Sequence, residues 1–125
     1  MPSAPRTYAD SLRLCNGTNG EMIVCNTARL DHAEAELRAV SRQLLQELRA
    51  TGREESGVSE SLAVGAFLQA QNRWRTRCDS ECQWRYGWRV GSMYLPVVVA
   101  CEDRLTPARG GELQSYRREL RQESR

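Results

Sequence analysis

The cysteines are the residues of this 125-residue chain whose type and spacing say most about its chemistry. The chain contains five of them: Cys15, Cys25, Cys78, Cys82 and Cys101. So many thiols in a small domain indicate a metal site, redox catalysis or disulfides. A zinc site is disfavoured because the single histidine, His32, lies far from any cysteine pair and no C-x-x-C occurs. The missing C-x-x-C also argues against a thiol–disulfide enzyme. We therefore expect disulfides, no metal and no cofactor, in an oxidising compartment: the periplasm, the cell envelope or the extracellular medium.

The other titratable residues do not form a recognisable catalytic set. One histidine does not complete an identifiable Ser-His-Asp or Cys-His arrangement, and His32 has acidic neighbours in a helical stretch, so we expect it on the surface. The Asp and Glu residues alternate with Arg on solvated faces and lack an apolar setting that would raise a carboxyl pKa. We therefore expect a protein that is not an enzyme.

Composition excludes two further classes of protein. The formal net charge of +2 is too small to indicate a nucleic-acid partner. No apolar run reaches the length of a transmembrane helix. The opening residues, MPSAP, lack an apolar signal-peptide core, so we expect that the signal of an exported form has been removed from this sequence.

The segment WRYGWR, residues 84–89, is the densest group of side chains suited to binding another protein. Trp, Tyr and Arg are over-represented at the hot spots of protein interfaces. The candidate partner-binding residues are Trp84, Arg85, Tyr86, Trp88 and Arg89. Two interpretations remain open: the segment is an exposed binding surface, or its aromatic rings fold back over the nearby cysteines.

A helix must position the cysteines that precede this segment. Its stripe of residues recurs in steps of four, three, four and four: Phe67, Gln71, Trp74, Cys78 and Cys82. These steps return to one helical face and predict a buried stripe. We expect this helix to run from about Ser59 to about Trp84, with Gln71 bonded to a helix-end or loop backbone group.

An earlier helix has a clear start and a clear apolar face. Thr18 and Glu21 have the spacing of a capping box, and Gly52 predicts a stop after about Ala50. Its apolar positions recur mostly in three- and four-residue steps: Met22, Cys25, Ala28, Leu30, Ala33, Leu37, Val40, Leu44 and Leu48.

The last third of the chain predicts two shorter helices. The apolar run MYLPVVVAC favours a short helix over 96–105, and Thr106 followed by Pro107 favours a cap and a new helix start. We expect a flexible arm over 1–11, a helical domain over 12–120 and a frayed tail over 121–125. The predicted class is all-α: a small antiparallel bundle of two long helices and a broken third helical segment, stapled by disulfides.

Several ordered motifs carry a family resemblance. AQNRW at 70–74 is followed by D-x-x-C at 79–82, and C-x-x-x-L-T-x-x-R-x-x-x-L spans 101–113. Together with the earlier cysteines and Glu21, this layout resembles the LprI-like lysozyme-inhibitor family of bacterial envelope proteins over 12–113. The motif residues for which we expect structural roles are Glu21, Gln71, Trp74, Asp79 and Arg109. For Asp79 and Arg109 we expect an ion pair or a cap between helices.

The resemblance also sorts the cysteines. Cys15, Cys25, Cys82 and Cys101 match the four of the family, which makes Cys78 the extra, free thiol. Three pairings of the four are possible. In an antiparallel hairpin the start of one helix meets the end of the next, so we favour Cys25–Cys82 with Cys15–Cys101.

Membership implies a helical envelope protein and suggests three functions. The first is inhibition of a lysozyme or related muramidase by obstruction of its active-site cleft. The second is a periplasmic immunity protein that neutralises a cell-wall-cleaving bacterial effector. The third is a disulfide-stapled structural or adaptor domain with no enzyme target.

Overall fold

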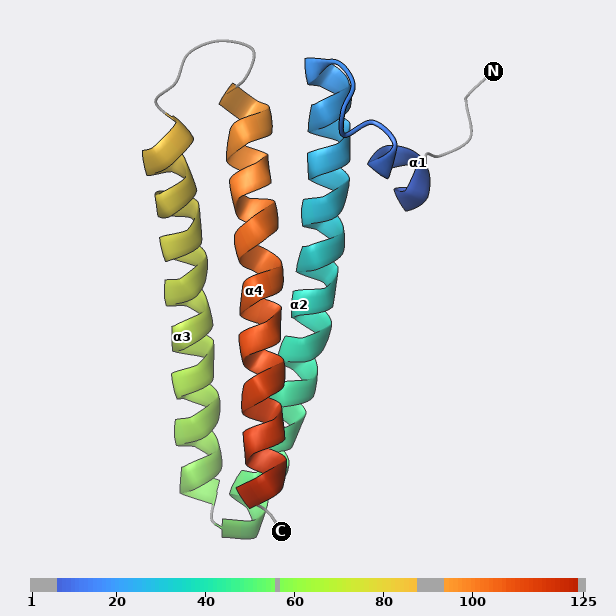
Figure 1. Ribbon diagram of the computed structural model, residues 1–125. Helices are drawn as coiled ribbons and strands as arrows, with labels where there is room; N and C mark the ends of the chain where they lie inside the picture. Colours follow the sequence, from blue (N-terminus) through green and yellow to red (C-terminus); the bar gives the residue numbers. More distant parts are fainter. Residues whose placement is uncertain (1–6, 56, 88–93, 124–125) are drawn as a thin grey trace, which may run out of the picture.

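Long helices make up almost all of the protein. The computed structural model describes residues 7–55, 57–87 and 94–123 (Figure 1). In chain order these form α1 (Tyr8–Leu12), α2 (Asn19–Glu55), α3 (Gly57–Cys82), the π-helix η1 (Gln83–Gly87) and α4 (Tyr94–Glu123). The described residues contain no strand, which confirms the all-α class.

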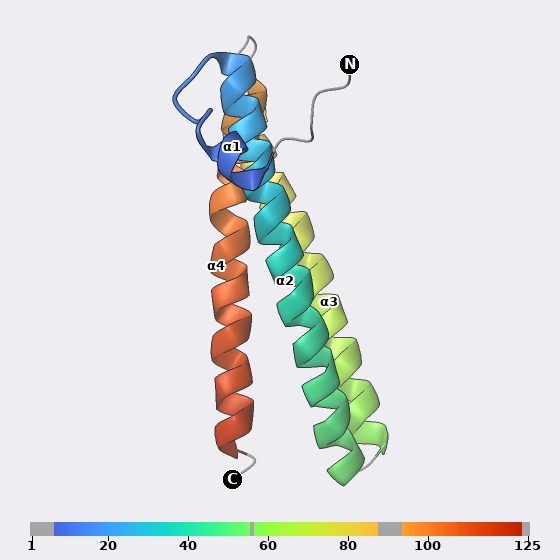
Figure 2. The same ribbon diagram turned by 90° about the vertical axis from the view of Figure 1, so that its right-hand side faces the viewer.

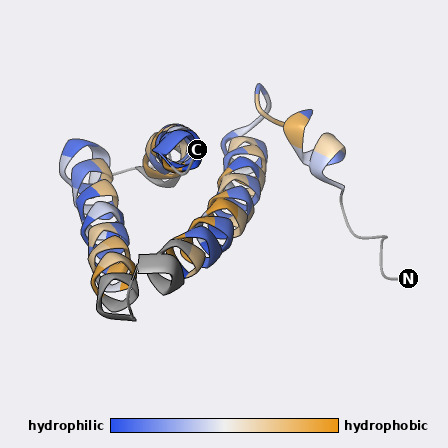
Figure 3. Ribbon diagram, turned by 90° about the horizontal axis from the view of Figure 1, so that it is seen from below, coloured by the Kyte–Doolittle hydropathy of each residue, from blue (hydrophilic) through white to orange (hydrophobic). Residues whose placement is uncertain are grey.

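The three long helices form a small antiparallel bundle. The chain runs along α2, reverses into α3, and reverses again into α4 (Figure 1). Seen end-on, the three helices lie at the corners of a triangle (Figure 3). The last helix packs mainly against α2 and touches α3 at fewer places, so one side of the triangle is more open than the others.

Capping boxes start both N-terminal helices. The Thr18 hydroxyl accepts from the Glu21 amide at 3.2 Å, and the Glu21 carboxylate accepts from the Thr18 amide at 3.0 Å, as predicted. Thr7 and Asp10 form the same motif at the start of α1. Residues 8–11 of the flexible arm expected over 1–11 are therefore helical, as part of α1, which a local cap holds against the first turns of α2 (Figure 2).

The apolar stripes predicted for the first two long helices face the core. Leu37, Leu44 and Leu48 of α2 are buried together with Leu113 of α4. On α3 the stripe residues are buried or half-buried, and Cys78 and Cys82 are 3% and 0% exposed. Because burial of apolar surface stabilises by roughly 25 cal/mol per Å², these stripes supply most of the packing energy.

Two helix boundaries differ from the predictions. The first long helix continues through Gly52 to Glu55, because a glycine ends a helix only when it adopts the left-handed conformation and otherwise costs about 1 kcal/mol. The expected break at Thr106 is absent: α4 is continuous to Glu123, with Pro107 inside it. Thr106 is fully buried and donates its hydroxyl to the Glu102 carbonyl at 2.9 Å, which is a bond within a helix and not a cap.

The disulfides involve the expected four cysteines in a different pairing. Cys15 is bonded to Cys25 and Cys82 to Cys101, with Cα–Cα distances of 5.1 Å and 5.7 Å, and Cys78 is free and buried. The predicted pairing is wrong because the end of α3 meets the start of α4, not α2. The loop after α1 likewise places its cysteine beside the first turns of α2. Both bridges lie at the same end of the bundle, the disulfide end.

None of the described helices is both long enough and apolar enough to cross a bilayer.

Candidate functional site

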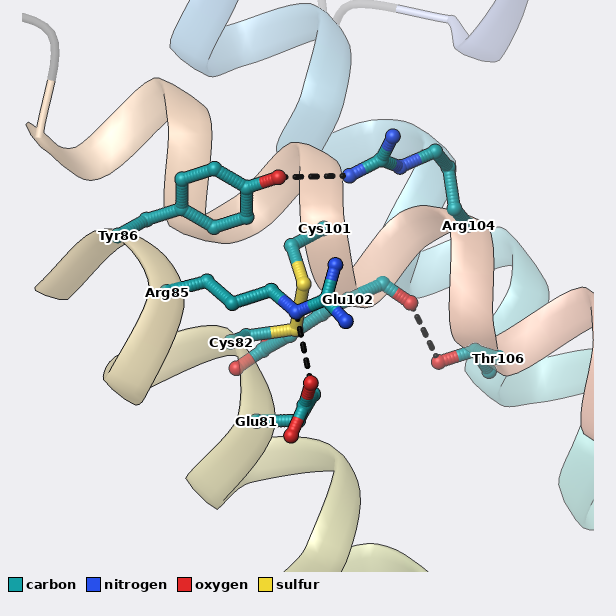
Figure 4. The surroundings of a disulfide bond; sticks show 8 residues. All are labelled: Glu81, Cys82, Arg85, Tyr86, Cys101, Glu102, Arg104 and Thr106. Atoms are coloured by element: carbon teal, nitrogen blue, oxygen red, sulfur yellow. Dashed lines mark hydrogen bonds and ion pairs between the residues drawn. A yellow bond between two sulfur atoms is a disulfide. The ribbon is translucent and has the colours of Figure 1, made fainter.

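The Cys82–Cys101 bridge anchors the disulfide end of the bundle. It joins the last turn of α3 to α4 (Figure 4). With Val98 it forms a small core, against which Tyr86 and Leu105 pack. The Tyr86 hydroxyl accepts a hydrogen bond from Arg104 Nη2 at 3.4 Å, and this bond lowers the pKa of the tyrosine. The bridge therefore holds η1 in a defined position on the end of α4.

The segment predicted to bind a partner is divided by this arrangement. Trp84 is 74% exposed and Arg85 is also exposed, whereas Tyr86 packs back on the disulfide. Part of the segment is thus exposed and part folds back over the disulfide, and binding by the exposed part stays a prediction. Trp88 and Arg89 lie outside the described residues. Since a π-helix has more residues per turn than an α-helix, η1 changes the register with which side chains leave the end of α3.

Arg85 is held by its own helix. Its Nε donates to Glu81 Oε1 at 2.7 Å, one turn earlier (Figure 4), and this hydrogen bond raises the pKa of the guanidinium. The side chain is 56% exposed, so the pair limits its rotation without removing it from solvent. Trp84 and Arg85 together present an aromatic ring and a positioned cation at the disulfide end.

A groove of about 670 Å³ runs between α3 and α4, on the open side of the triangle. Its lining combines four arginines, two glutamates and four apolar side chains: Ala70, Arg73, Trp74, Arg77, Cys78, Glu81, Arg85, Leu105, Arg109 and Glu112. We call it the α3–α4 groove. A hollow of about 520 Å³ beside Trp84 shares Arg77, Glu81 and Arg85 with it, so the exposed tryptophan stands at its edge.

Arg109, which lines the groove, belongs to a polar bridge between all three long helices. Gln71 donates to Ser41 Oγ of α2 at 3.3 Å and accepts from Arg109 Nε of α4 at 2.8 Å. Arg109 also pairs with Glu112 at 3.0 Å and lies 6.0 Å from the centre of the Trp74 ring. The expected bond of Gln71 to a backbone group and the expected Asp79–Arg109 pair are therefore both wrong. Gln71 instead bonds the side chains of Ser41 and Arg109 on the facing helices, and Arg109 pairs with Glu112 one turn further along α4.

Acidic side chains surround the free thiol at the edge of the groove. Burial, with the nearby charges of Glu102 and Asp79, raises the pKa of Cys78 to about 11. Burial also raises the pKa of Glu102, as do Asp79 and Glu34, although Glu34 is itself paired with Arg75 at 3.1 Å. A thiol in this setting remains protonated at neutral pH and is a poor nucleophile.

The remaining motif residues have local roles. His32 is exposed as expected, stacks on Tyr8 with ring centres 4.4 Å apart, and bonds Glu36 at 2.8 Å. Glu21 is engaged in its capping box. Within the described ranges, no three side chains of the His, Cys, Asp or Glu type are grouped so as to hold a metal ion.

Sequence reasoning missed Arg73 and Arg77, because the alternation of Arg with Asp and Glu predicts only solvated helix faces. Both are exposed and line the α3–α4 groove. The available signal was that Arg73 and Arg77 are four residues apart and flank Trp74, which places two cations on the helix face that carries a half-buried aromatic ring.

Comparisons with known proteins give one match. The family model described as "Lysozyme inhibitor LprI" matches residues 15–113. Neither a curated protein nor a solved structure matches the chain.

Proposed function

This chain belongs to the lysozyme inhibitor LprI family, and we propose that it acts outside the cytoplasm by binding a lysozyme or related muramidase and obstructing its active-site cleft. The match covers most of the chain, from the first disulfide cysteine to the core residue Leu113. Family membership supports a protein partner. The two disulfides support an oxidising compartment.

The observation that carries the proposed mechanism is the exposure of Trp84. A tryptophan that is 74% exposed leaves a large apolar surface in water, which marks a candidate contact with another molecule. It lies two residues after Cys82, whose bridge to α4 restricts the motion of this end. Such pre-organisation reduces the entropy cost of association.

The chemistry of this end suits a glycosidase cleft. Muramidases cleave through paired carboxylates in a groove that binds sugar rings. The Arg85 guanidinium is always charged and can donate two parallel bonds to a carboxylate, and an indole ring can occupy the space of a sugar. We propose that Trp84 enters a sugar subsite and that Arg85 approaches the acidic residues. Trp88 and Arg89 remain proposed members of the same surface.

The test is inhibition of peptidoglycan turnover by purified muramidases, with binding measured by calorimetry. Trp84→Ala should weaken binding by roughly 1–3 kcal/mol, the usual range for a hot-spot aromatic residue. Leu62→Ala is the matched control, because Leu62 is a large apolar side chain on α3 that is 70% exposed at the opposite end. Equal inhibition by Trp84→Ala and the parent protein would place the binding surface elsewhere.

Charge favours one alternative partner, a bacterial cell-wall-cleaving effector that the protein would neutralise as an immunity protein. The chain has a formal charge of +2, and four arginines against two glutamates line the α3–α4 groove. A strongly basic lysozyme of the c type would therefore be repelled at long range. The muramidase panel should include acidic and basic enzymes, since tighter inhibition of the acidic ones supports this alternative.

A further inference from the structure

The α3–α4 groove contains positive charge that the protein does not neutralise. Both of its glutamates are already bonded to arginines of the same groove: Glu81 to Arg85 at 2.7 Å and Glu112 to Arg109 at 3.0 Å. Among the described residues, Arg73 and Arg77 form no ion pair and no hydrogen bond. The groove therefore has two guanidinium groups available for negative charge from another molecule.

The position of these two arginines favours carboxylates as ligands. They are four residues apart on α3, so their Cβ atoms are roughly 5–6 Å apart on one helix face. Guanidinium groups bind carboxylates through two parallel hydrogen bonds, which is stronger and more directional than contact with a single ammonium group. The half-buried ring of Trp74 lines the same groove and adds apolar surface beside the two arginines.

The groove continues as an apolar pocket toward the opposite end of the bundle. This pocket of about 380 Å³ shares Ala70, Arg109 and Glu112 with the basic part. Its other lining residues come from all three long helices and are apolar or aromatic: Leu48, Ala63, Ala66, Phe67, Leu113 and Tyr116. One continuous surface therefore has a basic half and an apolar half.

We propose that the α3–α4 groove binds an amphipathic helical segment of a partner protein that carries carboxylates at one end and apolar side chains at the other. Helices with one apolar face bind in grooves of this kind, between two helices that run in opposite directions (Figure 1). Here α3 and α4 are the two walls and α2 contributes Leu48 to the apolar half, so a bound helix would occupy the open side of the triangle. The apolar half disfavours a purely anionic glycan, because negative charges along it would find no partner beside Ala63, Ala66 and Phe67.

This inference does not require that the partner be a muramidase. The basic half of the groove ends beside Trp84, because the neighbouring hollow shares Arg77 and Arg85 with it. One partner could contact both surfaces, or the groove could act alone. The experiment therefore uses a probe that is independent of any enzyme.

The probe is a fluorescein-labelled synthetic peptide in which glutamates and leucines recur at helical spacing, and its twin has glutamine in place of each glutamate. Fluorescence anisotropy should show binding of the acidic peptide to the full chain, weaker binding of the twin, and loss of affinity with added salt. The double variant Arg73→Glu/Arg77→Glu should bind the acidic peptide about tenfold more weakly or worse, because each reversal replaces an attraction with a repulsion. Ala70→Trp should also weaken binding, since it fills the groove without changing its charge.

The matched control is Arg38→Glu/Arg42→Glu. These arginines are also exposed and four residues apart, but they lie on α2 away from the lining of the groove. The control should keep the parent's affinity, and circular dichroism should show that all variants fold. Equal binding of both peptides, or equal loss in the groove and control variants, would overturn the proposal.

Two other outcomes would replace the proposed occupant. Tighter binding of soluble peptidoglycan fragments than of the acidic peptide, lost in the groove double variant, would identify a glycan ligand. Concentration-dependent dimers that the same variant abolishes would identify a second copy of this chain. Muramidase inhibition, assayed on the same variants, tests the proposed function separately. If the parent protein inhibits no muramidase, the proposed function is wrong, and the peptide experiment still tests whether the groove binds an acidic helix.

Discussion

Cys78 shows how one helical stripe can hold residues with different chemistry. It is one turn before Cys82 on the same face of α3, yet Cys82 is in a bridge and Cys78 is a thiol. The resemblance to the family predicted this difference, and the structure confirms it. Burial and the charges of Glu102 and Asp79 keep the free thiol protonated, which protects the neighbouring disulfide from thiolate attack.

We expect Cys78 to react slowly with a disulfide reagent such as DTNB in native protein at pH 7. A pKa of about 11 in place of 9.0 lowers the thiolate fraction about 100-fold, and burial limits access further. Absorbance at neutral pH measures the rate, and guanidinium chloride should restore rapid reaction. The control is Cys78→Ala/Ser80→Cys, which places a thiol at an exposed position two residues along α3. Native Cys78 that reacts as fast as this control would contradict the burial of the thiol.

At the scale of elements, α4 is the helix that departs most from expectation. It carries a proline and the pair Gly110–Gly111 within its length and is nevertheless continuous. The Thr106 hydroxyl and the packing against α2 maintain the helix where Pro107 removes a backbone donor. Tertiary packing thus overrides local signals for a helix break.

Gly111→Ala should stabilise the protein by about 1 kcal/mol, because alanine loses less backbone entropy than glycine in a helix interior. A Cβ atom added at Gly111 would meet no atom within 4 Å, so the gain should not be offset by a clash. Urea unfolding measures the free-energy difference. Gly20→Ala is the control: it is equally unobstructed but lies in the first turn of α2, where the helix frays and the gain should be smaller. A loss of stability in Gly111→Ala would mean that the glycine pair permits a backbone distortion that α4 needs.

The whole molecule is held by different chemistry at its two ends. The disulfide end is cross-linked by two bridges. Toward the opposite end, Arg117 of α4 donates to Glu47 of α2 at 2.7 Å and 3.0 Å and to Gln43 at 2.7 Å. The hydrogen bond from Arg117 is the main reason that the pKa of Glu47 is lowered from its ordinary value of 4.5.

This division predicts that reduction and acid loosen opposite ends. The folded pKa of Glu47 lies below its unfolded value, so its stabilisation is complete above pH 4.5 and is lost as the pH falls through the lowered value. At the disulfide end, burial raises the pKa values of Glu102 and Asp103. Their protonation in acid therefore removes the free-energy cost of keeping two partly buried carboxylates charged. Hydrogen exchange, corrected for intrinsic rates, should show lost protection around Glu47 once the pH falls below its lowered pKa, and around Cys82 and Cys15 under reductant. Uniform loss along the chain in both conditions would show that the bundle opens as one cooperative unit.

The sequence by itself determined the features that depend on interactions within a few residues. The capping box of Thr18 and Glu21, the stripes of the first two long helices and the all-α class follow from helical periodicity and local hydrogen bonds. The family resemblance added the set of four bridged cysteines and the free thiol, and the matching family model agrees with it.

Only the tertiary structure decided what depends on how the helices dock. The disulfide pairing required knowing that the end of α3 meets α4. The partners of Gln71 and Arg109 lie on other helices or on the next turn, at positions that sequence spacing does not relate to one another. The α3–α4 groove exists because α4 packs mainly on α2 and leaves α3 at a distance. Local periodicity says which face of a helix is apolar, but the choice among neighbouring helices is made by the packing of the whole bundle.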